Sequence, residues 1–176
     1  MKFSIDSEQR MTNDPATLLT IVDHNIEVKD WLTSWSILNG VIYEFPEYGP
    51  AYNYKGWLCV HVLKAYEEAK EYFELAIKYS PDYQPTYVNY ASLLNTLDKY
   101  QELEELIKKA LLIEGIDKVN LYSEWGLLYE KTQNFDQAIE SYLEAIKYSL
   151  HYDEISLLEE SMNRCTSKKN ILTLQY

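Results

Sequence analysis

Chain breakers are scarce in this sequence, since 176 residues contain only 5 glycines and 5 prolines. A many-stranded sheet needs turn residues at short intervals, so this scarcity favours long helices joined by short turns. Cysteines are scarcer still. Cys59 and Cys165 lie far apart and in no spacing typical of metal ligands. We therefore expect no disulfide framework and a reducing, cytoplasmic location.

Positive charge is also in short supply, with 16 basic against 28 acidic residues and a formal net charge of −12. Nucleic acid binding requires clustered lysine and arginine, so this balance argues against it. The longest apolar run, around Gly56–Leu63, is broken by His61 and is too short to span a bilayer. Residues 1–13 carry charges without an apolar core, unlike a secretory signal. We predict that the protein binds neither nucleic acid nor membrane.

Groups that would carry catalysis are missing from the sequence. Its histidines, His24, His61 and His151, lie near no other histidine or cysteine in a metal-binding spacing. There is no glycine-rich phosphate loop and no G-x-S-x-G motif. The acidic runs at 67–68 and 102–105 have lysines close by and are typical of a solvated helix face. We expect no enzymatic activity, no cofactor and no metal.

Tyrosine, by contrast, is abundant, and much of it recurs in a repeat. The 17 tyrosines include those in YEFPEYGPAYNYKG, which begins at Tyr43, and in KYSPDYQPTYVNYA, which begins at Lys78. A shift of 35 residues superposes the prolines and tyrosines of the two segments: Pro46, Tyr48, Pro50 and Tyr52 on Pro81, Tyr83, Pro85 and Tyr87. Self-similarity at such a period is typical of repeat architectures.

The repeated positions describe a helical hairpin. A small residue, Gly56, Ala91 or Gly126, recurs where a second helix would approach the first. Aromatic residues spaced by three and four lie on one stripe of each helix. A proline or glycine such as Pro81 or Gly115 then ends the unit. Cys59 occupies a core position of this pattern, which favours a buried filler over a nucleophile.

These residues resemble the tetratricopeptide repeat, whose signature is W-x2-L-G-x2-Y followed by A-x3-F and a closing proline. The best copy runs from Tyr122 through Trp125, Gly126 and Tyr129 to Ala145. The resemblance implies an all-α, right-handed α-solenoid of helix-turn-helix repeats with a C-terminal capping helix. It divides the chain into an N-terminal extension at 1–13, a degenerate repeat at 14–48, repeats at 49–83, 84–118 and 119–152, and a capping helix with a tail at 153–176.

Three details of this division can be tested in a structure. The repeat at 49–83 has one extra residue, which we place in the turn between its helices. Ile155, Leu158 and Met162 share one face of the closing helix at 153–163. The tail TSKKNILTLQY that follows is either disordered or folded back on the stack.

The resemblance also implies a function, because members of this family hold a peptide or helix of a partner on the concave face lined by first helices. The positions in that register form a groove of Leu18, Val22, Asn53, Trp57, Val60, Val88, Asn89, Ser92, Asn95, Ser123, Leu127 and Glu130. Its apolar residues predict an apolar or amphipathic protein or peptide partner, with Trp57 as the anchor. Trp57 packing within its own hairpin is the open alternative.

Two further readings of the sequence concern the partner. The groove positions include no lysine or arginine, so we predict that it does not bind the acidic C-terminal tails of heat-shock chaperones. Similarity to small acidic chaperones of bacterial secretion systems suggests a chaperone-like protein for a secreted partner, by analogy alone. Self-association into a homo-oligomeric scaffold, with the tail ILTLQY docked in a neighbouring copy, is the other alternative.

Overall fold

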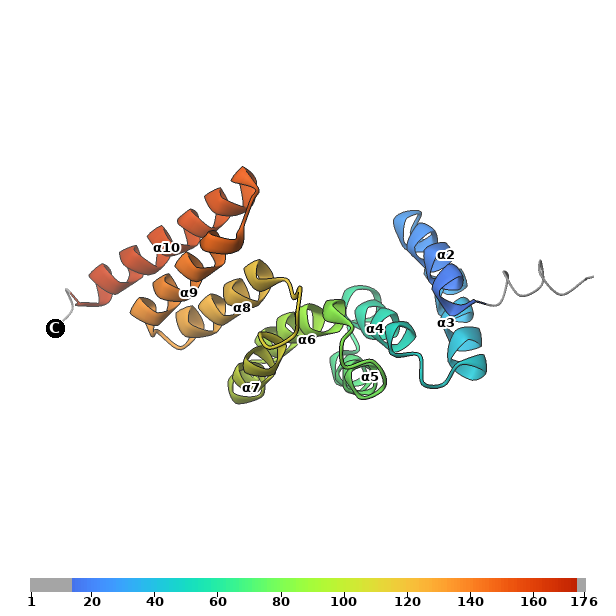
Figure 1. The fold of residues 1–176 in the computed structure, drawn as a ribbon. Helices are drawn as coiled ribbons and strands as arrows, with labels where there is room; N and C mark the ends of the chain where they lie inside the picture. The colour runs from blue at the N-terminus through green and yellow to red at the C-terminus, as the bar shows by residue number, and fades with distance from the viewer. Residues whose placement is uncertain (1–13, 174–176) are drawn as a thin grey trace, which may run out of the picture. The chain divides into compact units, whose positions relative to one another are not determined.

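The computed structural model describes residues 14–173, and it forms helices and no strand in that range. Figure 1 shows the helices, which are α2 (Pro15–Glu27), α3 (Trp31–Glu44), α4 (Gly49–Leu58), the π-helix η1 (Cys59–Leu63), α5 (Tyr66–Tyr79), α6 (Gln84–Thr96), α7 (Tyr100–Ala110), α8 (Lys118–Lys131), α9 (Phe135–Tyr148) and α10 (Tyr152–Thr173). The all-helical prediction is confirmed. None of these helices has the length and apolar character that crossing a membrane requires. The predicted N-terminal extension lies outside the described residues.

The chain divides into two compact units, and the boundary between Thr86 and Tyr87 falls inside α6. In the first unit, α2 packs against α3 and α4 packs against α5. In the second unit, α9 lies between α8 and α10 and packs against both (Figure 1). Consecutive helices are therefore packed as hairpins within each unit.

Three helices begin at an aspartate that caps them. Asp14, Asp30 and Asp117 each accept a hydrogen bond from the backbone N–H three residues later, at 3.0–3.1 Å. These bonds satisfy one of the N–H groups that the first turn of a helix leaves without a partner. At α2 the cap is followed by Pro15, which lacks the N–H group that would be unpaired there.

Every helix pair turns through a residue in the left-handed backbone region. These residues are Lys29, Lys64, Asp98 and Gln133, with φ between 55° and 62°. Their spacings of 35, 34 and 35 residues equal those of the sequence repeat. The first pair, whose sequence matches the signature least, thus closes with the same turn as the others.

Glycines let the two helices of a pair come into close contact. A Cβ atom on Gly56 would lie 2.6 Å from the ring of Phe73, and one on Gly126 would lie 2.5 Å from the ring of Tyr142. Contacts this short do not occur in folded proteins, so only glycine fits at either position. The expected role of small residues at these two places is confirmed.

Lys55 is a buried cation that ties the first unit together. Its ammonium lies 4.1 Å from the ring centroid of Trp35 on α3 and 4.6 Å from that of Tyr72 on α5. It donates a hydrogen bond of 2.9 Å to the side-chain oxygen of Asn39. Burial lowers the pKa of Lys55 from its ordinary value. The two aromatic faces and the amide replace part of the hydration that this ammonium loses.

The extra residue of the second repeat lies in a helix and not in the turn where the sequence placed it. The helix α4 continues directly into the π-helix η1, whose wider turns accommodate one more residue. The backbone N–H of Lys64 then bonds to the carbonyl oxygen of Cys59, five residues earlier. The turn that follows, Lys64 and Ala65, is shorter than the other inter-helix turns.

The closing helix is longer than predicted. Helix α10 extends ten residues beyond position 163, to Thr173, so most of the tail is neither disordered nor folded back. Leu158 and Cys165 are buried, and Ile155 and Met162 are half-buried, which places these four on the face toward the rest of the unit. The predicted apolar face is correct and continues by one more turn.

Candidate binding surface

In the first unit, the predicted groove residues belong largely to the core. Val22 is fully buried, and Leu18 and Trp57 pack against the same cluster of core side chains. The Trp57 ring also lies 4.5 Å from the ring of His61, one turn along. Asn53 is buried, and Val60 in η1 is half-buried. Val22 and Asn53 are therefore closed to a ligand, whereas Leu18, Trp57 and Val60 keep part of their surface exposed.

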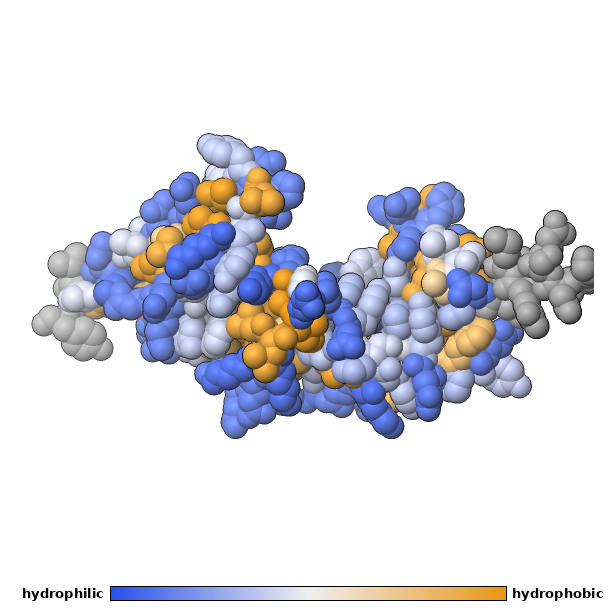
Figure 2. Space-filling view, viewed as in Figure 1, coloured by the Kyte–Doolittle hydropathy of each residue, from blue (hydrophilic) through white to orange (hydrophobic). Residues whose placement is uncertain are grey.

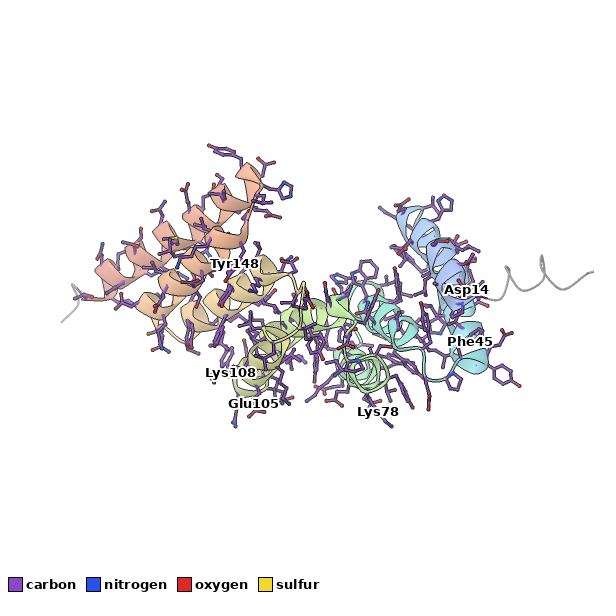
Figure 3. All side chains as sticks on the ribbon, in the orientation of Figure 1. Asp14, Phe45, Lys78, Glu105, Lys108 and Tyr148 are labelled. Atoms are coloured by element: carbon purple, nitrogen blue, oxygen red, sulfur yellow. The ribbon has the colours of Figure 1, made fainter. Side chains whose placement is uncertain are left out.

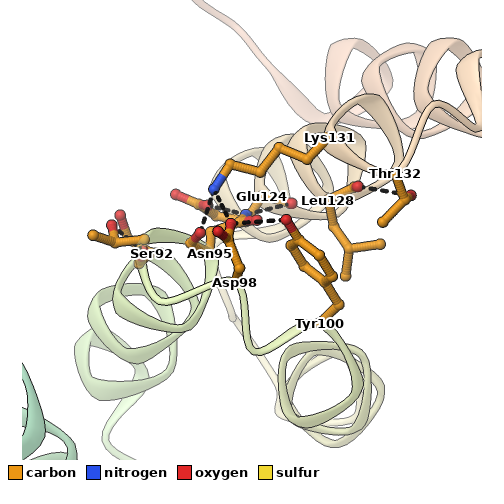
Figure 4. A network of polar contacts seen from close by, with 9 residues as sticks. Ser92, Asn95, Asp98, Tyr100, Glu124, Leu128, Lys131 and Thr132 are labelled. Carbon is orange, nitrogen blue, oxygen red and sulfur yellow. Dashed lines mark hydrogen bonds and ion pairs between the residues drawn. The ribbon is translucent and has the colours of Figure 1, made fainter.

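In the second unit, the predicted groove contains a polar network between α6 and α8, which Figure 4 shows. The amide nitrogen of Asn95 donates to the carboxylate and to the backbone carbonyl of Glu124, at 2.6 and 2.7 Å. Ser92 also donates to Glu124. Lys131 donates to the Asn95 carbonyl at 2.5 Å and to Asp98 at 2.7 Å. The network fixes α8 against α6 along the predicted groove.

The carboxylate of Glu124 lies in this network without a cation bonded to it. Burial raises the pKa of Glu124 above its usual value, although the hydrogen bonds from Asn95 and Ser92 oppose that shift. Among the predicted α6 residues, Asn95 is buried, Val88 and Asn89 are half-buried, and Ser92 is exposed. Glu124 was not predicted as a groove residue, although it directly follows Ser123, which was.

Helix α10 continues the series of first helices that form the predicted groove. It begins at Tyr152, 34 residues after α8 begins at Lys118, and α8 in turn begins 34 residues after α6 begins at Gln84. Helix α10 thus has the register of the first helix of a further repeat. Ser123, Leu127 and Glu130 of α8 correspond to Leu157, Ser161 and Arg164 of α10.

A cleft of about 320 Å³ lies between α8 and α10, and we refer to it as the α8–α10 cleft. The side chains that define it come from both helices: Ser123, Glu124 and Leu127 from α8, and Glu154, Leu157, Ser161 and Arg164 from α10. Leu157 is 64% exposed, and Leu127 is half-buried. Figure 2 shows apolar surface over α10 with hydrophilic surface around it. Two of the predicted groove residues therefore line a concave surface.

Glu130, another predicted groove residue, is instead engaged by α10. Its side chain is 4% exposed, and Arg164 donates two hydrogen bonds to its carboxylate at 2.7 and 2.8 Å. Lys168 donates a third at 2.8 Å, and the Tyr142 hydroxyl a fourth at 3.1 Å. The bonds from Arg164 are the main reason that the pKa of Glu130 falls to about 2. Arg164 and Tyr142 of this cluster also line the α8–α10 cleft, whereas Glu130 itself is buried beneath them.

The groups considered for chemistry lie in inert surroundings. Cys59 and Cys165 are both buried, and burial raises the pKa of each thiol to about 11. Among the described residues, no three histidine, cysteine or acidic side chains come together as metal ligands would. His24 and His61 are exposed. The acidic run on α7 points outward with Lys108, as Figure 3 shows for Glu105, so the solvated-face prediction holds there.

Comparison with known proteins agrees with this geometry. The model of the tetratricopeptide repeat matches residues 50–83 and 119–152. The chain carries tetratricopeptide repeats. The matched segments span α4 to α5 and α8 to α9, the two hairpins with the close glycine contacts. Tetratricopeptide domains are protein–protein interaction modules, and this is the general class of function to which the chain belongs.

Solved structures of other tetratricopeptide proteins share the fold at low identity. The thermophilic protein TTC0263 of Thermus thermophilus is 16% identical, with a TM-score of 0.72 over 88% of this chain and 84% of that one. YrrB, described as having an unusual peptide-binding site, is 13% identical, with a TM-score of 0.68 over 92% and 81%. MamA is 17% identical, with a TM-score of 0.64 over 87% and 86%. These similarities establish a solenoid of helical repeats. No curated protein sequence matches the chain.

Proposed function

We propose that this tetratricopeptide protein binds an apolar or amphipathic segment of a partner protein in the α8–α10 cleft, without catalysis. The observation that carries the proposal is the cleft itself. It combines Leu127 and Ser123, which the repeat register predicts to face a ligand, with Leu157 and Ser161 from α10. An apolar surface framed by polar groups is the usual composition of a protein-binding site.

The proposal narrows the binding surface expected from the sequence. The first unit buries Val22 and Asn53 and packs Trp57 against its core, so Trp57 is not the anchor in this version of the function. The α8–α10 cleft is instead the place where a partner's apolar side chain would be removed from water. Burying one leucine-sized side chain contributes about 2 kcal/mol.

Site-specific photo-crosslinking tests the proposal. A photoreactive amino acid at position 127 or 157 would be introduced into the full chain, which is then irradiated in a lysate of its own cells. The control is position 112, where Leu112 is 87% exposed on the α7–α8 connection. We expect positions 127 and 157 to crosslink to the same protein and position 112 not to do so.

Two results would count against the cleft. If all three positions gave the same products, contact with the partner would not be specific to the cleft. If positions 127 and 157 crosslinked only to a second copy of this chain, the cleft would serve the self-associating scaffold that the sequence left open.

A further inference from the structure

The α8–α10 cleft has an excess of carboxylates. Glu124 and Glu154 line it, one on each wall, together with the single cation Arg164. The Arg164 guanidinium is held by both oxygens of Glu130 and does not neutralise either wall. The charge that remains at the cleft surface is therefore negative.

The other cations near the cleft are also engaged elsewhere. Lys131 bonds to Asp98 and to the Asn95 carbonyl, and Lys168 bonds to Glu130. Glu154 accepts a hydrogen bond from the Ser149 hydroxyl at 2.6 Å, and Glu124 accepts from the neutral groups of Asn95 and Ser92. Both cleft carboxylates are thus hydrogen-bonded by neutral donors, and Lys131 attracts Glu124 only weakly and without a direct bond, so an added cation is favourable.

Partial burial makes an added cation still more favourable at Glu124. A carboxylate that loses water without a directly bonded cation is destabilised, and burial raises the pKa of Glu124 despite the opposing hydrogen bonds from Asn95 and Ser92 and the attraction of Lys131. Because Leu127 and Leu157 lie in the same cleft, a bound apolar segment would remove still more water from the carboxylate. A partner without a compensating charge would be rejected by the same effect.

We infer that the partner segment carries a lysine or arginine beside its apolar side chain, and that the α8–α10 cleft recognises the two together. This inference rests on the function proposed above. The apolar side chain lies against Leu127 and Leu157, and the cation lies between the carboxylates of Glu124 and Glu154. The partner is therefore a basic amphipathic segment of a protein.

The test uses short amphipathic helical peptides with leucine at the a and d positions of a heptad and with lysine, glutamine or glutamate at the flanking positions. Affinities for the full chain would be measured by fluorescence anisotropy. The methyl NMR signals of Leu127 and Leu157 would report whether the cleft is occupied. We expect the lysine peptide to bind about tenfold more tightly than the glutamine peptide, and the glutamate peptide to bind most weakly.

Variants separate the cleft charges from the charge of the whole molecule. The double variant Glu124→Gln, Glu154→Gln should lose the preference for the lysine peptide, so that it binds the lysine and glutamine peptides about equally. The control Glu67→Gln, Glu68→Gln makes the same charge change on the exposed face of α5 and should keep the preference. If both double variants lost the preference equally, the attraction would come from net charge, and the inference would be wrong.

The remaining outcomes distinguish the inference from the proposed function. Equal affinity for all three peptides, with both methyl signals shifted, would overturn the requirement for a cation and leave the cleft as the binding site. If no peptide shifted the signals of Leu127 and Leu157, the proposed function would fail together with the inference.

Discussion

Gly126 lies directly against the ring of Tyr142, so closely that a Cβ atom on Gly126 would be 2.5 Å from it. This contact joins α8 to α9 and brings the Tyr142 hydroxyl to Glu130, which in turn binds α10. The absence of a side chain at Gly126 therefore permits the contacts that join α8, α9 and α10. The relationship links the packing of the hairpin to the cleft that we propose as the binding site.

Gly126→Ala should destabilise the protein by about 2 kcal/mol, because inserting a methyl group into packed surroundings forces neighbouring atoms to move. The matched control is Gly40→Ala on α3, where nothing lies within 4 Å of the added Cβ atom. There, alanine should stabilise the helix by up to about 1 kcal/mol. Urea unfolding measures the change in the free energy of unfolding for each variant. Changes of the same sign in both would contradict the close contact at Gly126.

The left-handed turn residues give a second prediction. Gln133 is exposed, with φ of 62°, a conformation that costs a residue with a side chain more than it costs glycine. Gln133→Gly should therefore stabilise the protein by about 0.5–1 kcal/mol. Asp98 has the same backbone conformation, but its side chain bonds to Lys131 and Tyr100.

Asp98→Gly is thus the informative control, because it relieves the same backbone strain and loses those two contacts. Its gain should be smaller than that of Gln133→Gly, because the contacts with Lys131 and Tyr100 are lost. The midpoints of thermal unfolding compare the two variants. Equal gains would show that the Asp98 contacts contribute nothing to stability.

The attachment of α10 gives a third prediction. Arg164→Met keeps most of the aliphatic side chain and leaves the buried carboxylate of Glu130 with Lys168 as its remaining cation. Because Arg164 is half exposed, we expect the free energy of unfolding to fall by about 1–3 kcal/mol, which is less than the usual cost of breaking a fully buried ion pair. Lys108→Met removes an exposed, solvent-screened pair with Glu104 on α7 and should leave the stability nearly unchanged. Hydrogen exchange of the α10 backbone would show whether the loss is local, and equal effects of the two variants would contradict a special role for Arg164.

Much of the repeat architecture could be predicted from the sequence, because its determinants are local. Prolines, small residues and aromatic stripes specify where a helix begins, how closely its partner approaches and where it ends. Gly56 and Gly126 lie against aromatic rings as their spacing predicts. The position of the extra residue in η1 could not be predicted, since a wider helical turn and a longer loop require the same number of residues.

The candidate site was predicted less completely, because it depends on contacts between distant segments. Ser123 and Leu127 follow from the repeat register, and both line the α8–α10 cleft. The opposite wall was missed because the closing helix was expected only to cap the last repeat, so its residues Glu154, Leu157 and Ser161 were not assigned to the groove. One signal was available: Arg164 and Lys168 are spaced by four, and Arg164 lies 34 residues after Glu130. Continuing the repeat register by one more helix would have brought these charges together.

The stability of the second unit should depend on pH through Glu130. In the folded chain its pKa is about 2, below the ordinary value of 4.5, chiefly because of the hydrogen bonds from Arg164. A carboxyl group with a lowered folded pKa contributes stability above its unfolded pKa. That contribution is lost as the pH falls from about 4.5 towards 2, and it amounts to about 3 kcal/mol at neutral pH.

Glu130→Gln tests this dependence, because it keeps the shape of the side chain and removes the charge. At pH 7 the variant should be less stable than the wild type by about 2–3 kcal/mol, and the difference should shrink as the pH falls below 4.5. Glu105→Gln on the exposed face of α7 should follow the wild type throughout. Urea unfolding between pH 7 and pH 2.5 measures all three proteins. A constant difference across that range would mean that Glu130 stabilises the fold by packing, and that the ionic contacts with α10 do not hold the wall of the cleft in place.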